Sequence, residues 1–349
     1  MNEIPYMNMN EIPSYKGFNK DLQCRGFQYE VGKEYEQKGE IKCCEKGFHA
    51  CKFPTDVFLY YPPVDDNRYC IVTQSGDIAE NNTTDSKVAS SKIFIKSEVS
   101  AEQLTEFGID YILNNIRYSI QTTDIYCCIE NRNTSITNDI YNCAAINTGS
   151  YSAAINNKMN SIAGCTNEHS VVINNGPLSV VGTTEDNSII NNTKEGDSSI
   201  CGSTGNHSVI KNNSDRTILV NIGSYSTIIN NGYNSSAISN GVCTYIKTTE
   251  DYSTAVNTGY QSHVEAGNLS VAISTGMYST ARATGKESIA IATGNCSRAA
   301  GNLGDWIVLT EYEGIVNFIK EVKAFKVDGE KIKPNIFYKL VDGEPVEID

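Results

Sequence analysis

The 349-residue chain has little positive charge and no long apolar run, and each scarcity excludes a class of protein. It carries 28 lysine and arginine residues against 41 aspartate and glutamate residues, a net charge of −13. Nucleic-acid binding needs clustered cations that neutralise phosphates, so no nucleic-acid partner is expected. The opening sequence MNEIPYMNMNEIPSYKGF has no basic stretch followed by an apolar one. It predicts neither a secretory signal nor a membrane span, and therefore a cytoplasmic protein.

Disulfides are not expected, although the chain has 12 cysteines. The cysteines are scattered over a long chain without a secretory signal, which favours reduced thiols. One dense group, CCEKGFHAC, ends at residue 51. Thiolates and an imidazole at such spacing are considered as metal ligands, namely Cys24, Cys43, Cys44, His49 and Cys51. The paired CxxC arrangement typical of zinc sites is absent, so neither a metal nor another cofactor is expected. A cysteine nucleophile with His49 as its base lacks an identifiable orienting carboxylate, and no catalytic residue is assigned.

From residue 152 to residue 297 the sequence repeats about every nine positions. Position 1 is Ser or Thr in all seventeen units, from Ser152 to Ser297, with Ser198 in the sixth unit. Position 3 is a small or branched aliphatic residue throughout, with Ile200 in the sixth unit. Thirteen of the sixteen intervals are nine residues, and the others are ten, ten and eight. A short fixed period of this kind indicates a solenoid, whose units bury their apolar faces only by stacking.

Each unit is predicted to form one short strand and one turn, and two units to form one rung of a parallel β-solenoid. Because strand side chains alternate between faces, positions 1, 3 and 5 point inward and positions 2 and 4 outward. The inward hydroxyls are expected to bond to the neighbouring rung. Glycine is common at position 7, for example Gly259 and Gly276, and is expected to supply the positive φ of a tight corner.

The outward positions predict two chemically different faces. One face has an apolar column and the other is polar, with His263, Glu265 and Arg282. His263 and the other two histidines of the array are expected on the solvated surface. Val171 with Ile173, and Thr227 with Ile229, are expected to continue the apolar column. The apolar face predicts association with a second copy, unless its branched residues only reflect strand preference. The predicted interface residues are Ile238, Val256, Val271, Ile273, Ile289 and Ile291.

The flanking segments complete a mainly β protein of four parts. Residues 1–14 are predicted to be disordered, 15–115 to form an α+β module, 116–300 the solenoid and 301–349 a small β-rich cap. In the module, Ser100 and Gln103 have the spacing of a helix capping box. In the cap, two Asp-Gly pairs predict turns, and Trp306 is expected to cover the last rung.

Three stretches resemble an uncharacterised protein family of bacteriophages and prophages. They are the module with KGF, RGFQYEVGK and GFHAC, the NTGxxSAA-like units such as AINTGSYSAA, and the ending WIVLTEYEG. The resemblance implies a phage or prophage origin, hence the host cytoplasm or else the virion, and it implies no activity. The SVAI and SIAI units are also similar to the left-handed β-roll of trimeric adhesin heads, whose repeats are longer.

These patterns predict a non-enzymatic structural or interaction protein that acts through its repeat face, by homo-oligomerisation or by binding a host protein. Two alternatives stay open. GFHA followed by DVFLYY and RYCIVTQSG is similar to the order of elements in ADP-ribosyltransferases, which implies an enzymatic N-terminal module. The other alternative is a virion or surface component that binds glycans.

Overall fold

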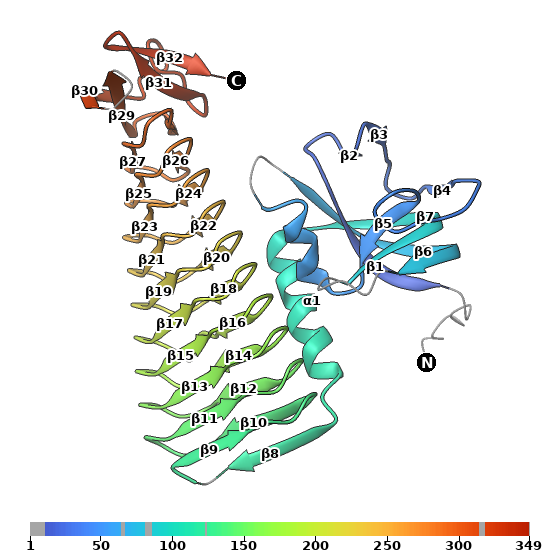
Figure 1. Ribbon diagram of the computed structural model, residues 1–349. Coiled ribbons are helices and arrows are strands. Elements are labelled where there is room, and N and C mark those ends of the chain that lie inside the picture. The colour runs from blue at the N-terminus through green and yellow to red at the C-terminus, as the bar shows by residue number, and fades with distance from the viewer. Residues whose placement is uncertain (1–10, 64–66, 81–85, 123, 314–317, 349) are drawn as a thin grey trace. The chain divides into compact units, whose positions relative to one another are not determined.

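The computed structural model describes residues 11–63, 67–80, 86–122, 124–313 and 318–348. The chain divides into two compact units, one up to Tyr111 and the other from Ile112 onward. Strands account for most of the regular structure of both units (Figure 1). The mainly β fold predicted from the sequence, with an N-terminal module and a central solenoid, is confirmed.

The N-terminal unit is built around a small antiparallel sheet. The strand order is β4-β7-β5-β1-β6, and an additional pairing of β7 with β6 closes β7, β5, β1 and β6 into a ring, with β4 paired to β7 beside it. Phe18, Phe48, Val72 and Ile93 lie in its core. The elements are β1 (Ile12–Phe18), β2 (Gln23–Cys24), β3 (Phe27–Gln28), β4 (Glu34–Glu36), β5 (Phe48–Cys51), the 3-10 helix η1 (Pro54–Leu59), β6 (Arg68–Glu80), β7 (Lys87–Val99) and α1 (Ala101–Asn114).

The start of this unit differs slightly from the sequence expectation, whereas the start of its helix agrees with it. Strand β1 begins at Ile12, so residues 12–14 are ordered by pairing with β6 and are not part of a disordered terminus. Residues 1–10 lie outside the described residues. The capping box that begins α1 is confirmed, because the Ser100 N–H donates to Gln103 Oε1 at 2.9 Å and the Gln103 N–H donates to Ser100 Oγ at 3.2 Å.

The second unit is a parallel β-solenoid of about 11 turns with two sheets. Each nine-residue repeat contributes one strand, and consecutive repeats alternate between the two sheets. The 13-stranded sheet contains β8 (Tyr118–Thr122), β10 (Thr134–Asn138), β12 (Ala153–Asn156), β14 (Val171–Asn174), β16 (Ile189–Asn192), β18 (Val209–Asn212), β20 (Thr227–Asn230), β22 (Tyr245–Thr248), β24 (His263–Ala266), β26 (Thr280–Ala283), β28 (Arg298–Ala300), β31 (Phe337–Val341) and β32 (Glu344–Ile348). The 12-stranded sheet contains β9 (Tyr126–Ile129), β11 (Ala144–Asn147), β13 (Ile162–Cys165), β15 (Val180–Thr183), β17 (Ile200–Ser203), β19 (Ile218–Asn221), β21 (Ser236–Ser239), β23 (Thr254–Asn257), β25 (Val271–Ser274), β27 (Ile289–Ala292), β29 (Trp306–Glu313) and β30 (Phe318–Lys326).

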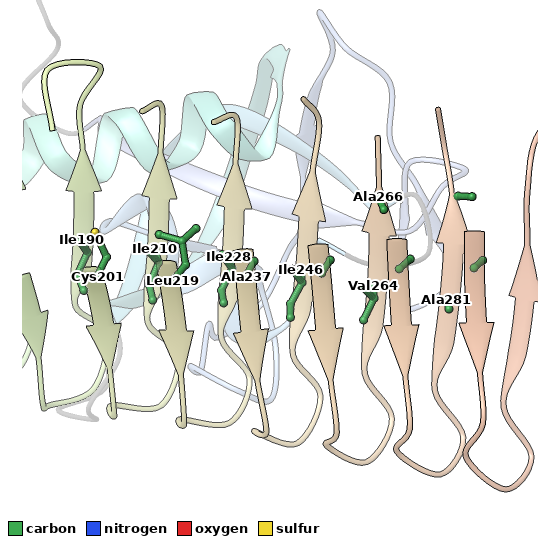
Figure 2. Packing of buried hydrophobic residues seen from close by; sticks show 14 of the residues in the cluster. Ile190, Cys201, Ile210, Leu219, Ile228, Ala237, Ile246, Val264, Ala266 and Ala281 are labelled. Atoms are coloured by element: carbon green, nitrogen blue, oxygen red, sulfur yellow. The ribbon is translucent and has the colours of Figure 1, made fainter. Parts of the chain in front are cut away.

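Position 3 of every unit fills the narrow space between the two sheets. Figure 2 shows these side chains in consecutive rungs, among them Ile210, Leu219 and Ile246, which are buried. The position 1 hydroxyls are also buried and bond to the preceding rung as predicted. Ser279, for example, accepts the N–H of Ser262 at 3.0 Å and donates to the Gly259 carbonyl at 3.1 Å.

Position 5 adds a third inward column, whose hydrogen-bond network was not predicted from the sequence. In the 13-stranded sheet this column is a run of asparagines, which we call the asparagine ladder. Five side-chain amides, all but that of the last asparagine, donate to the carbonyl oxygen of the asparagine in the next rung, at 2.7–3.1 Å. All are buried, so these bonds replace the water that the amides would otherwise bind. The ladder consists of Asn138, Asn156, Asn174, Asn192, Asn212 and Asn230.

The sixth unit of the array is shifted by one residue from the predicted alignment. Ser198 has φ of 57°. In all the other units of the array, this left-handed conformation occurs at the last position of the unit. The buried hydroxyl of position 1 is therefore Ser199, and Cys201 points inward while Ile200 points outward. The preceding turn holds two extra residues, 194–195, and these displaced the alignment.

Glycine at position 7 is required by close approach and not by positive φ, so this prediction was wrong. A Cβ atom on Gly259 would overlap the carbonyl oxygen of Gly241 in the preceding rung, and a Cβ on Gly276 would overlap that of Gly259. The left-handed residue of the turn is position 9, which is Gln261 or Tyr278 in these units, with φ of 51° and 56°.

We expect Gly259→Ala to lower the free energy of unfolding by about 2 kcal/mol, because the added methyl group forces two stacked turns apart. The matched control is Gly164→Ala, where an added Cβ would lie 3.5 Å from the Gly182 carbonyl, an ordinary contact. Thermal unfolding followed by circular dichroism compares the two variants. Equal unfolding midpoints in both would contradict the close-approach explanation.

The C-terminal cap ends the parallel stacking by changing strand direction. β29 continues the rod parallel to β27, whereas β30 and β31 pair antiparallel with β29 and β28. Tyr338, Leu340 and Ile332 join the solenoid core. The Asp-Gly turn between β31 and β32 is confirmed, with positive φ at both Asp342 and Gly343. Trp306 does not cover the last rung, since it lies beside Ile289 in register on the outer face and is 44% exposed.

Candidate functional site

The outer face of the 12-stranded sheet is apolar along the rod. Its outward residues at positions 2 and 4 stack in register from β13 to β29, over roughly 40 Å at ~4.8 Å per rung. Several are large and exposed, including Ile162 at 51% and Ile218 at 45%. We call this surface the apolar ladder. It consists of Ile162, Val180, Ile200, Ile218, Val220, Ile238, Val256, Val271, Ile273, Ile289, Ile291, Trp306 and Val308.

All six interface residues predicted from the sequence lie in the apolar ladder. Ile238 pairs in register with Val256, Val256 with Ile273, and Ile273 with Ile291. Val271 and Ile289 form the neighbouring column in the same strands. Thus the structure brings the predicted set together on one surface of one sheet.

The predicted continuation of this face toward the N-terminal half was wrong. Val171 and Ile173 belong to β14, and Thr227 and Ile229 to β20, which are strands of the other sheet. One rung contains two units, so the face recurs only in every second strand. The true continuation is Ile218 in β19, Ile200 in β17, Val180 in β15 and Ile162 in β13.

The ladder carries no charge and changes width along its length. At positions 2 and 4 of the described strands β11 to β29, every outward residue is uncharged. In β13, β15 and β17, position 4 is Gly164, Gly182 and Gly202, so only one column projects there. From β19 onward position 4 is Val or Ile, so the surface is wider. The ladder therefore has a narrow part of three strands and a broad part of six.

The outer face of the 13-stranded sheet carries a polar cluster near its C-terminal end. Glu265 accepts a hydrogen bond from the Tyr245 hydroxyl at 3.1 Å and lies 3.1 Å from His263 Nε2. Burial alone would raise the pKa of Glu265, but His263, Tyr245 and the charge of Lys247 lower it to about 2. The His263 ring stacks on Tyr245 and is buried, so its expected position on the solvated surface was wrong.

The N-terminal unit contains a cavity of about 830 Å³. Its wall includes an aromatic cluster, whose rings meet mainly edge to face at centroid distances of 4.8–6.5 Å. We use this name for Phe27, Tyr29, Tyr35 and Phe48. The volume is in the range of small-molecule sites in proteins.

Four of the five residues considered as metal ligands line this cavity, namely Cys24, Cys44, His49 and Cys51. Cys43 does not, and its thiol lies 3.9 Å from the Lys87 carbonyl oxygen. Within the described ranges no three His, Cys, Asp or Glu side chains are grouped as metal ligands would be. His49 Nε2 accepts the backbone N–H of Cys44 at 2.9 Å. Burial and the charges of Lys16, Arg25 and Lys87 lower the pKa of His49 to about 4.

Lys16 is the cavity residue that the sequence analysis missed. Its side chain lies in β1 and is only 4% exposed. Nζ donates to the His49 carbonyl at 2.8 Å and lies 3.5 Å from Cys24 Sγ. Burial lowers the pKa of Lys16, although the neighbouring Cys24 raises it. Its signal in the sequence is weak, because one lysine in a polar strand usually faces water.

Residues 12–106 match a family described as a domain of unknown function (DUF7666). This match covers the N-terminal unit and leaves the solenoid unmatched. No curated protein and no solved structure is significantly similar to the chain. Among the described residues, no helix has the length and apolarity needed to cross a membrane.

Proposed function

We propose that this chain is a non-enzymatic interaction protein that associates with a second copy through the apolar ladder. The observation that carries the proposal is the uncharged, exposed outer face of the 12-stranded sheet, which extends over nine strands from β13 to β29. Contiguous exposed apolar surfaces of this extent are typical of protein interfaces. Two such sheets can pack face to face at about 10 Å.

The changing width of the ladder favours an antiparallel pair. A two-fold axis perpendicular to the rod places the first strands of one copy against the last strands of the other. The narrow part, with Gly164, Gly182 and Gly202, then faces the last three strands of the broad part, with Ile273 and Ile291. The glycines leave room for the opposing side chains, whereas a parallel pair would place the broad part of one copy against the broad part of the other.

The biological setting that we propose is a bacteriophage or prophage, with the protein in the host cytoplasm or in the virion. Its support is the resemblance of the GFHAC module and the WIVLTEYEG ending to phage and prophage proteins. Mass spectrometry of purified particles and of infected-cell lysate tests this part separately. Detection in particles favours the virion, and detection in the lysate alone favours the cytoplasm. Detection in neither contradicts the setting.

We expect the wild-type protein to have twice the 38.2 kDa chain mass in size-exclusion chromatography with light scattering. Ile238→Lys should weaken the dimer at least about 100-fold, because Ile238 lies in the middle strand of the ladder, where two lysines would meet in the antiparallel pair. The matched control is Ile222→Lys, at an exposed turn isoleucine outside the ladder. A monomeric wild type, or a dimer that Ile238→Lys leaves intact, would overturn the proposal.

A further inference from the structure

Lys16 in β1 carries a buried ammonium group. Among the residues that the structure describes, no carboxylate forms an ion pair with it. Its neighbours are the His49 carbonyl, Cys24 Sγ, and the rings of Phe18 and Tyr29, whose centroids lie 5.5 and 5.3 Å from Nζ. An ammonium group has three donors, and two of them are directed at the His49 carbonyl and Cys24 Sγ. Because Lys16 lines the cavity, the ammonium group can also donate to a group bound there.

The cavity is basic in an acidic protein. The chain has a net charge of −13, but the wall of the cavity carries four cationic side chains, Lys16, Arg25, Lys46 and Lys87. It carries two carboxylates, Glu36 and Glu45, and Glu36 lies 3.6 Å from Lys92 outside the wall. Burying a cation without an opposite charge is costly. An anion in the cavity would remove that cost and compensate the excess of positive charge.

The rest of the wall is suited to a flat apolar group. Phe27 and Tyr29 meet at 4.8 Å, and Phe27 meets Tyr35 at 5.4 Å, in both cases edge to face. Phe27 is 45% exposed although it belongs to this cluster. An exposed ring beside other rings offers a stacking surface, which aromatic ligands prefer. Together with a few polar groups that fix orientation, this composition is typical of small-molecule sites.

We propose that the N-terminal cavity binds a small anion that carries an aromatic ring, with the acidic group at the Lys16 ammonium and the ring against the aromatic cluster. The acidic group supplies Lys16 with the opposite charge that no carboxylate of the described residues gives it. Arg25 and Lys87 attract the anion to the cavity. This site lies wholly within the N-terminal unit and is independent of the apolar ladder.

The test uses the full chain and three probes of similar shape, namely benzoate, phenyl phosphate and the uncharged benzamide. Ligand-observed NMR titration measures the binding of each probe. At least one of the two anions should bind with a Kd of about 1 mM, as small ligands of this size allow. Benzamide should bind at least about tenfold more weakly, because it lacks the negative charge that pairs with the Lys16 ammonium group. Absence of binding by both anions, or equal binding of benzamide, would overturn the proposal.

Three cavity variants and one control locate the bound probe. Lys16→Met should weaken anion binding at least about tenfold, whereas Lys20→Met, at an exposed lysine outside the cavity, should not change it. Phe27→Leu removes an exposed ring and should also weaken the binding of each anion that binds the wild-type protein. If Lys16→Met does not fold, Phe27→Leu and Arg25→Gln decide the outcome. Binding that none of the folded cavity variants weakens would overturn the proposal.

Discussion

Asn192→Leu is expected to lower the free energy of unfolding by about 4 kcal/mol. Asn192 accepts from Asn174 Nδ2 and donates to Asn212 Oδ1, both at 2.7 Å, inside the asparagine ladder. It also donates to the Gly196 carbonyl at 3.2 Å. Leucine has a similar volume but no polar atoms, so these buried partners lose their hydrogen bonds without gaining water.

Urea unfolding measures this loss, with Asn240→Leu as the matched control. Asn240 is an exposed asparagine in a turn of the same solenoid, so its replacement should change the free energy of unfolding by less than about 0.5 kcal/mol. The unfolding of stacked repeats need not be two-state, and hydrogen exchange at the rungs on either side of Asn192 reports the local effect directly. If the two variants are equally stable, the asparagine ladder does not stabilise the rod.

Glu265→Gln is expected to lower the free energy of unfolding by about 3 kcal/mol at pH 7. Although burial opposes it, the hydrogen bond and charge of His263, with Tyr245 and Lys247, lower the pKa of Glu265 from 4.5 to about 2. A carboxyl group whose pKa is lower in the folded state stabilises the fold above its unfolded pKa. This contribution is lost as the pH falls from about 4.5 to about 2.

The difference between Glu265→Gln and the wild type should therefore be largest at neutral pH and shrink toward zero near pH 2. Urea unfolding at pH 7, 4 and 2.5 tests this dependence. Glu250→Gln, at an exposed turn carboxylate, is the control and should follow the wild type at all three pH values. A constant difference for Glu265→Gln across the series would show that packing of the side chain, and not its charge, is what matters.

The solenoid could be predicted from the sequence because its period and its backbone geometry are directly related. Side chains alternate along each strand, so an unbroken aliphatic column at position 3 identifies the inward face. A strand and the turn after it have a nearly constant length, and this fixes the spacing of the repeats in the sequence. The start of the helix at Ser100 could also be predicted, because a capping box is a local signal of four residues.

Features that depend on contacts between rungs were harder to predict. The carbonyl that excludes a Cβ at Gly259 belongs to a turn eighteen residues earlier. The pattern within one repeat does not show this contact, so the glycine was expected to supply a positive φ instead. Trp306 was expected to cover the end because the end needed an apolar cover. Tyr338 and Leu340, which follow about thirty residues later, provide it. The burial of Lys16 depends on the pairing of β1 with β5 and β6, which no local pattern indicates.

The alternation of consecutive units between two sheets restricts how this array can lengthen or shorten. Inserting or deleting two consecutive units, usually eighteen residues, adds or removes one whole rung and leaves every later side chain on its own face. An odd number of units would transpose the faces beyond the change, moving the isoleucines of β27 to the sheet that holds Arg282. The extra residues 194–195 escape this restriction because they lie in a turn. Evolutionary variation in rod length should therefore proceed by pairs of units, while loops vary by single residues.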